Sequence, residues 1–371
     1  MTRGRFHGTG GSKLRVAPRF LASGLDRRQR TLAGLITVVG IGVGLALTRA
    51  ELERRMTRAR QARDRKFVLA REESLADGLQ RMALGQLDLA IELLERQNGD
   101  DDERTIHETR KAIKRLRALL RLLRSEIGQP QFKSNNRALR EINRRLAGAR
   151  DAQVMLATLR ALLEREEKQF RSRKPVRGLL ARLQSAREDT LTQPTITGEG
   201  RDAIVGELLA VRALLAEIEL QKRGFALLGD DLERIYRKGR RSMRTAKRTD
   251  DSEVMHEWRK HVKDLRYAAE MLTRESPGKD KDATRIGRVA RQANRLGELL
   301  GQEHDLALLG ECVEQHADLF VAHKRTRKRL RKLIDSRRRR LRRRALALGE
   351  RLYRRKPRAF SRAVRKSFDR S

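Results

Sequence analysis

One basic segment occurs twice in this 371-residue chain. The first copy, residues 107–117, reads HETRKAIKRLR, and the second, residues 256–266, reads HEWRKHVKDLR. The copies share a histidine, a glutamate, two arginines, two lysines and a leucine at the same offsets, while the other residues differ. Arginine and lysine bind phosphate oxyanions, and histidine adds a donor that gains charge below neutral pH. The repeat therefore predicts a basic surface that is used twice to contact an anion.

Each copy has a basic side and an apolar side when its residues are placed on a helix at about 100° per residue. The basic sides carry His107, Arg110, Lys111, Lys114, Arg117 and Arg121 in the first copy, and His256, Arg259, Lys260, Lys263, Arg266 and Tyr267 in the second. The opposite sides carry aliphatic residues and Trp258, which suit packing in a helical bundle. His261 falls on the apolar side and is interpreted as a core histidine.

A basic helix face can also be simply hydrated, which is the alternative to anion binding. A hydrated face is expected to mix both signs of charge in acid–base pairs three or four residues apart. The arc from His107 to Arg121 has one acidic residue, Glu108, near its margin. Stacked like charges repel, so the sequence favours a bound anion.

The composition indicates a helical protein with a polyanionic partner. Lys and Arg number 88 against 49 Asp and Glu, which gives a formal charge of +39. Such an imbalance implies a polyanion or an anionic membrane surface and excludes partners that are all neutral. Long stretches rich in Leu, Ala, Arg, Glu and Lys, interrupted by only six prolines, predict an all-α fold.

The sequence predicts no catalytic residue, no metal site and no cofactor. A single cysteine, Cys312, excludes an internal disulfide and a thiolate metal site, and it fits a reducing, cytoplasmic compartment. No His-Glu-x-x-His pair, glycine-rich phosphate loop or nucleophile beside a base is found.

An uncharged stretch near the N-terminus, TLAGLITVVGIGVGLALT at residues 31–48, approaches the length of a membrane span. The spacing of Gly40 and Gly44 is typical of close-packed membrane helices. The favoured interpretation is a single transmembrane helix that anchors the protein to the inner membrane. The alternatives are a signal peptide, because a basic stretch precedes it, and a buried helix. Both flanks are basic, so the orientation stays open.

Apolar periodicity predicts helices over residues 75–94, 103–127, 135–170, 201–221, 225–247, 252–275, 282–300 and 305–355. The helix of the first copy is expected to stop at Gly128 and Pro130. Each copy is followed by a related marker, LAGARD at residues 146–151 and LGQEHD at residues 300–305, so the repeated unit is expected to be a whole bundle. The segment QPTITGEG, residues 193–200, is the predicted boundary between the halves.

These residues resemble the CHAD domain, the conserved-histidine α-helical domain. Its signature is a histidine followed by arginine and lysine at helical spacing, once in each of two four-helix halves. The resemblance implies two pseudo-symmetric antiparallel four-helix bundles with a basic central channel. The chain departs from the family at Ala147, where glycine is usual, and in its N-terminal extension with the hydrophobic helix predicted above. The expected domains are a basic extension (1–72), the CHAD domain (73–355, with halves 73–195 and 200–355) and a basic tail (356–371).

The resemblance also implies a function, the non-catalytic binding of inorganic polyphosphate in that channel, with possible sites of action at polyphosphate granules. The implied polyphosphate-binding residues are His107, Arg110, Lys111, Lys114, Arg117, Arg121, Arg150, His256, Arg259, Lys260, Lys263, Arg266 and Tyr267. Arg150 is either a channel residue or half of a buried ion pair with a carboxylate such as Asp151. Binding is expected to strengthen toward acid pH through the histidines. The alternative function is nucleic-acid binding, for which nine Phe, three Tyr and one Trp offer few stacking surfaces.

Overall fold

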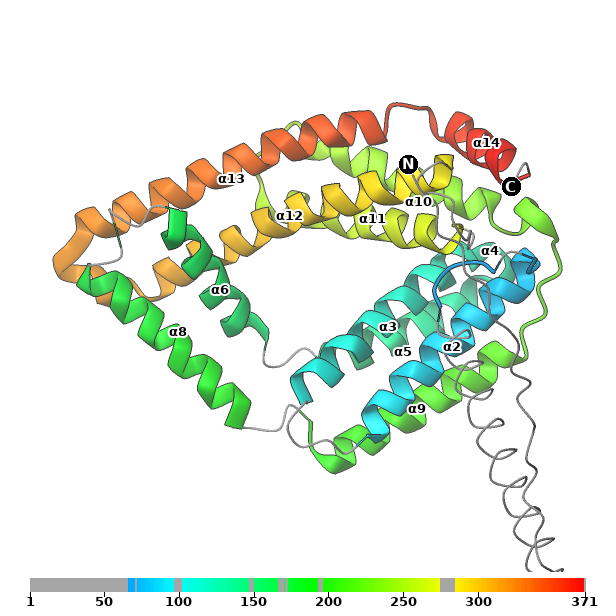
Figure 1. Cartoon of the computed structure of the whole chain (residues 1–371), viewed down its shortest axis with the longest axis horizontal. Helices are drawn as coiled ribbons and strands as arrows, with labels where there is room; N and C mark the ends of the chain where they lie inside the picture. Colours follow the sequence, from blue (N-terminus) through cyan, green and yellow to red (C-terminus); the bar gives the residue numbers. More distant parts are fainter. Residues whose placement is uncertain are drawn as a thin grey trace, which may run out of the picture. The chain divides into compact units, whose positions relative to one another are not determined.

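The computed structural model describes residues 66–70, 72–96, 102–146, 150–165, 170, 173–192, 196–273 and 284–369. Every regular element in these residues is a helix, which confirms the all-α prediction (Figure 1). The α-helices are α2 (Leu75–Glu95), α3 (Asp102–Leu122), α4 (Arg124–Ile127), α5 (Gln129–Arg145), α6 (Arg150–Arg165), α8 (Lys174–Thr192), α9 (Gly198–Ala216), α10 (Gly229–Ala246), α11 (Ser252–Met271), α12 (Arg285–Gln315), α13 (Lys324–Leu352) and α14 (Pro357–Phe368). Two 3-10 helices, η1 (Gly224–Leu227) and η3 (Ala317–His323), join them.

The two copies of the basic segment lie on α3 and α11, and these two helices pack against each other. Helix α3 also packs against α2, α5 and α10, while α11 packs between α10 and α12, and α12 packs against α13 (Figure 1). Helix α9 follows the predicted boundary at residues 193–200, yet it packs against α2 and α5, which precede that boundary. Helices α6 and α8 pack against each other, and α6 also packs against α12.

The apolar sides of α3 and α11 are buried in the core, as their periodicity predicts. Ile113 and Leu116 of α3 and Trp258, Val262 and Leu265 of α11 are almost completely inaccessible to solvent. Burying side chains of this size is the main favourable contribution to folding. This burial fixes the rotation of each helix, so the basic sides must point away from the core.

Side-chain caps set where several helices begin. Ser74 accepts a hydrogen bond from the backbone N–H of Asp77 at 3.1 Å at the start of α2. Asp251 accepts one from the N–H of Glu253 at 2.8 Å at the start of α11, and Thr284 caps α12 in the same way. Such caps satisfy N–H groups that have no partner within the helix. The cap at Asp251 therefore fixes where the second basic segment starts.

Some predicted helix ends are confirmed and others are wrong. The predicted stop at Gly128 is confirmed, because α4 ends at Ile127 and Gly128 adopts φ 84°, while Pro130 lies in the first turn of the next helix, α5. The expected helix 135–170 is two helices, α5 and α6. Helix α12 runs without interruption through Gly301, where the sequence predicted a break. The actual break after α12 lies at His316 and η3.

Two helices were not predicted. In α8, Val176, Leu179 and Leu183 are buried at helical spacing. In α14, which lies in the predicted basic tail, Phe360 and Val364 are buried, and the ring of Phe360 stacks on a tyrosine of α10 at a centroid distance of 3.9 Å. Both helices are rich in charged residues, and a few buried side chains are enough to pack each helix against the rest of the fold.

No helix of the described residues is both long and apolar enough to cross a bilayer. The predicted membrane anchor, residues 31–48, lies outside those residues and stays a prediction.

We expect Gly349→Ala to destabilise the fold, because the side chains of Trp258 of α11 and Met243 of α10 lie close to α13 at this glycine. A Cβ added at Gly349 would lie 2.6 Å from Cζ2 of Trp258 and 3.1 Å from Sδ of Met243. The cost should be roughly 1–3 kcal/mol of unfolding free energy, as for other overpacked sites. Urea unfolding followed by circular dichroism would measure it. Gly206→Ala in α9, where nothing lies within 4 Å of the added carbon, should instead be neutral or stabilising by about 0.5–1 kcal/mol.

Candidate anion-binding site

The basic side chains predicted to bind an anion lie at the surface of the bundle. His107 of α3 and Lys260 of α11 are exposed. The other predicted residues on these two helices are half-buried: Arg110, Lys111, Lys114, Arg117, Arg121, His256, Arg259, Lys263, Arg266 and Tyr267. Arg150 begins α6, and its side chain lies outside what the structure describes. Half-burial of long cations is favourable only where their charged ends reach water or an anion.

The basic faces contain more ion pairs than the sequence analysis allowed. Lys111 pairs with Glu108 at 3.0 Å, and Lys260 pairs with Glu257 in the equivalent position of the second copy. Pairs three or four residues apart are the property expected of a hydrated face, so the expectation that these faces lack acid–base pairs is wrong. Both pairs are largely exposed, and such pairs contribute only about 0–1 kcal/mol. An anion could therefore displace them at little cost.

A pocket of about 320 Å³ lies where α3 and α4 meet α10 and α11. The ion pair between Arg121 of α3 and Asp264 of α11, at 3.3 Å, joins two of its walls. Its basic lining residues come from four helices and are Arg121, Arg124, Arg234, Lys238, Lys260 and His261. Burial, Arg124 and Arg234 lower the pKa of Lys238, as expected where like charges crowd together.

Three of these lining residues, Arg124, Arg234 and Lys238, were not among the predicted site residues. Arg234 and Lys238 are four residues apart on α10, and that spacing was the available signal. Spacing alone does not show which neighbouring helix a basic side will face. The sequence therefore could not predict that these residues line this pocket.

His261 is not a core residue, and this part of the sequence analysis is wrong. Its side chain keeps 25% of its exposed area, lines the pocket and lies 4.0 Å from Asp264. Burial lowers the pKa of His261, while Asp264 opposes that shift. His261 lies at the margin of the apolar side of α11. Because α3 packs against α11 nearby, this margin borders the pocket.

Arg117 lies among other cations near the same junction. Its Nε donates to Oδ1 of Asn136 of α5 at 3.1 Å. Burial, followed by the charge of Arg121, lowers the pKa of Arg117 to about 10, and Asp264 partly opposes this shift. The guanidinium remains charged at neutral pH, but at an electrostatic cost. A bound anion would relieve that cost.

His304 of α12 meets the basic side of α11 and was missed by the sequence analysis. Its ring centroid lies 4.3 Å from that of His256. Burial lowers the pKa of His304 to about 4, with further contributions from His256, Arg259, Lys263 and Lys260. The available signal was its place in the LGQEHD marker, where His304 matches Arg150 of the first marker.

Gly301, in the same marker, explains how Arg259 reaches α12. A Cβ on Gly301 would lie 3.6 Å from Nη2 of Arg259, so the guanidinium lies against this turn of the helix. Gly301 lies between the two helices predicted over residues 282–300 and 305–355, and in the structure it provides a close-packing surface.

Tyr267 is a weaker candidate than the cations, because Phe67 covers its ring. The two rings meet edge to face at a centroid distance of 6.4 Å, and the guanidinium of Arg115 of α3 lies 5.1 Å from the Phe67 centroid. The backbone N–H of Leu69 donates to the carbonyl of Thr273 at 3.0 Å and holds this segment against the end of α11. Burial raises the pKa of Tyr267, so its hydroxyl stays protonated.

Within the described residues, no group of three or more His, Cys, Asp and Glu side chains could hold a metal ion.

Comparison with known proteins identifies the family. A family model for the CHAD domain matches residues 83–314, which is more than half of the chain. No curated protein matches the sequence. Among solved structures, the crystal structure of the CHAD domain from the plant Ricinus communis is similar, with 18% identity over 81% of this chain and 94% of that chain, and a TM-score of 0.41. The match to the family model confirms the resemblance seen in the two basic segments, and the chain belongs to the CHAD domain family.

Proposed function

We propose that this chain binds inorganic polyphosphate on the basic sides of α3 and α11 and catalyses no reaction with it. The observation that carries the proposal is the direct packing of α3 on α11, with Arg121 and Asp264 joining them. This contact joins the two basic segments at the pocket that Arg121 and Lys260 line. The proposal includes the finer architecture that the family suggests, a basic channel between two four-helix halves.

The proposed contacts are the predicted residues together with Lys238 and His304. Burial, with a further contribution from neighbouring cations, lowers the pKa values of both Arg117 and His304. A linear polyanion with one charge on each phosphate would neutralise several of these cations at once. Arginine suits this role because its planar fork pairs with two phosphate oxygens.

Polyphosphate is favoured over single-stranded nucleic acid by the burial of the aromatic residues. Of the Phe, Tyr and Trp side chains in the described residues, all but Tyr267 and Phe368 are buried. Proteins that bind single strands without sequence preference stack bases on exposed rings, a contact of ~1–3 kcal/mol per base. Tyr267 is partly covered by Phe67. The surface therefore supports phosphate contacts and offers little for bases.

A competition titration tests the proposal. Fluorescent long-chain polyphosphate bound to the full chain would be challenged with duplex DNA, RNA and polyglutamate over a range of salt concentrations. We expect unlabelled polyphosphate to displace the probe at much lower phosphate concentration than either nucleic acid. Affinity should fall as salt rises, because counterions are released when phosphates are neutralised. Equal displacement by duplex DNA would contradict the proposal and support a general polyanion-binding protein.

We expect polyphosphate binding to take up protons at His256 and His304. In the free protein, burial lowers the pKa of both side chains, to about 4 for His304, so both are neutral near pH 7. Bound phosphates would raise these pKa values. The affinity for polyphosphate should then rise as the pH falls through the pKa values of the bound state. It should level off below the pKa values of the free protein. Calorimetry in buffers with different ionisation enthalpies would measure the uptake.

The matched variants for this prediction are His304→Asn and His323→Asn. His323 is exposed on η3, so its loss should leave the proton uptake unchanged. Loss of His304 should reduce it. Identical pH dependence in the wild type and in His304→Asn would show that His304 does not contact the polymer.

A further inference from the structure

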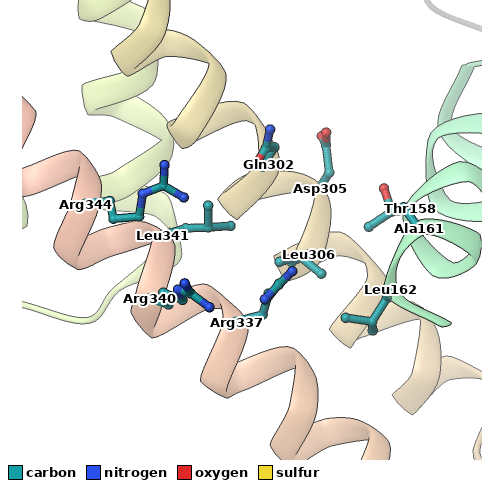
Figure 2. A pocket seen from close by; sticks show the side chains of 10 residues that line it. All are labelled: Thr158, Ala161, Leu162, Gln302, Asp305, Leu306, Arg337, Arg340, Leu341 and Arg344. Atoms are coloured by element: carbon teal, nitrogen blue, oxygen red, sulfur yellow. The ribbon is translucent and has the colours of Figure 1, made fainter. Parts of the chain in front are cut away.

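A second basic pocket lies on other elements, between α6, α12 and α13 (Figure 2). Its volume is about 340 Å³, near the lower end of the ~300–1,000 Å³ range of small-molecule sites. Figure 2 shows the arginines of α13 on one side of the pocket, Thr158 and Leu162 of α6 across from them, and α12 between the two. Among the side chains that the structure describes, none of those assigned to the polyphosphate surface lines this pocket.

The arginines of α13 fall into distinct groups, and one group faces the pocket. Arg338 and Arg342 donate to the buried carboxylate of Glu303 at 3.1 and 2.9 Å, so they are held by the protein itself. Arg337, Arg340 and Arg344 line the pocket instead, three and four residues apart on one side of the helix (Figure 2).

Two of these three arginines have no anionic partner in the part of the chain that the structure describes. Arg340 and Arg344 are exposed and make no hydrogen bond or ion pair with the described residues. The lining contains one carboxylate, that of Asp305, against the three guanidinium groups. The pocket therefore has excess positive charge, and guanidinium groups at this spacing suit phosphate oxygens.

Beside the polar residues Thr158 and Gln302, the lining has an apolar part that inorganic phosphate would not use. Leu162, Leu306 and Leu341 are buried residues whose side chains reach the pocket from all three helices. No aromatic ring of the described residues lines it, so these residues offer no stacking surface for a nucleobase. Aliphatic and cationic walls together fit a ligand with an anionic head and an aliphatic body.

We propose that this pocket binds a small aliphatic diphosphate. The phosphates contact Arg340 and Arg344, and the hydrocarbon part lies against the leucines of α6, α12 and α13. A diphosphate is favoured over a carboxylate because the two guanidinium groups of Arg340 and Arg344 exceed what a single negative charge can neutralise. This site lies on other helices than the polyphosphate surface on α3 and α11, and its ligand class goes beyond the function proposed above.

The test measures binding of geranyl diphosphate to the full chain by calorimetry, with inorganic pyrophosphate and geraniol as partial ligands. Geranyl diphosphate should bind at least about tenfold more tightly than pyrophosphate, because each buried methylene contributes to affinity. Geraniol, which lacks the charge, should bind more weakly still. Equal affinity for pyrophosphate and geranyl diphosphate would overturn the proposed ligand class.

Two matched double variants locate the site on α13. Arg340→Glu/Arg344→Glu should weaken geranyl diphosphate binding by about tenfold for each arginine reversed, since contacts to charged groups are of that strength. Arg339→Glu/Arg343→Glu makes the same charge change on the same turns of the helix, but these exposed residues do not line the pocket. This control should lose far less affinity. Equal losses in the two variants would overturn the site.

A third variant separates this proposal from the polyphosphate proposal. Lys114→Glu/Lys263→Glu alters α3 and α11 and should leave geranyl diphosphate binding within about twofold of the wild type, given the distance-dependent screening of surface charge. If this variant abolishes geranyl diphosphate binding while Arg340→Glu/Arg344→Glu does not, the diphosphate binds on α3 and α11 and the pocket proposal is wrong.

Discussion

The variant Lys114→Glu/Lys263→Glu is expected to bind long-chain polyphosphate roughly 100- to 1,000-fold more weakly than the wild type, a loss of about 3–4 kcal/mol. Lys114 and Lys263 occupy equivalent positions of the two basic segments, and both are half-buried. Each reversal removes an attractive charge and adds a repulsive one. Half-burial reduces the dielectric screening of that repulsion relative to water.

The control for this variant places the same charge change on another basic helix. Arg358 and Arg362 are exposed on α14, four residues apart, and neither lines a pocket near α3 or α11. Reversing both should weaken polyphosphate binding only modestly, through the change in net charge, and high salt should reduce the difference further. Fluorescence titration of both variants at two salt concentrations would compare them. A greater loss in the α14 variant would mean that α3 and α11 are not the binding surface.

The rotation of α3 and α11 was predictable from the sequence, because burial of one side determines where the other side points. Trp258, Val262 and Leu265 are buried where the helical period placed them. His261 was not predictable from the period, because its position at the margin of that side depends on how α3 packs nearby. A periodic pattern identifies a face, and it does not identify the helix that covers it.

The same limit explains the residues that the site analysis missed. Lys238 and His304 join the basic region only because α10 and α12 pack on either side of α11. Gly301 was ambiguous in the sequence, because glycine marks both helix ends and close helix contacts. In the structure it belongs to a continuous helix, and the guanidinium of Arg259 lies against it. The polyphosphate-binding roles of these residues stay predictions, and the titrations described above test them.

The variant Glu303→Gln is expected to lose about 3–5 kcal/mol of unfolding free energy, as when one partner of a buried ion pair is removed. Glu303 of α12 is 1% exposed and accepts hydrogen bonds from Arg338 at 3.1 Å and Arg342 at 2.9 Å. Arg342 is itself buried and also pairs with Asp250, just before α11, at 3.1 Å. Glutamine keeps the shape of the side chain and removes the charge. Two guanidinium groups would then lie in the protein without the carboxylate that neutralises them.

A second ion pair between the same two helices provides the control. Glu314 of α12 and Arg331 of α13 lie 3.3 Å apart, but half of the Glu314 side chain is exposed. Glu314→Gln should therefore cost less than about 1 kcal/mol. Urea unfolding of both variants would test the contrast, and equal stabilities would show that burial of Glu303 is not what makes its pair important.

A further variant separates the effect of charge from the effect of shape. If the cost of Glu303→Gln comes from uncompensated charge, then replacing Glu303, Arg338 and Arg342 together by methionine should recover much of the lost stability, because buried ion clusters are often replaceable by apolar side chains. The triple variant would also break the link from α13 through Arg342 to Asp250 at the start of α11. Since Glu303 directly precedes His304, we expect the recovered protein to be stable but to bind polyphosphate less tightly. Unfolding free energy and polyphosphate affinity, measured on one sample, would therefore show what this buried cluster does. It either only stabilises the fold or also holds the basic surface in position.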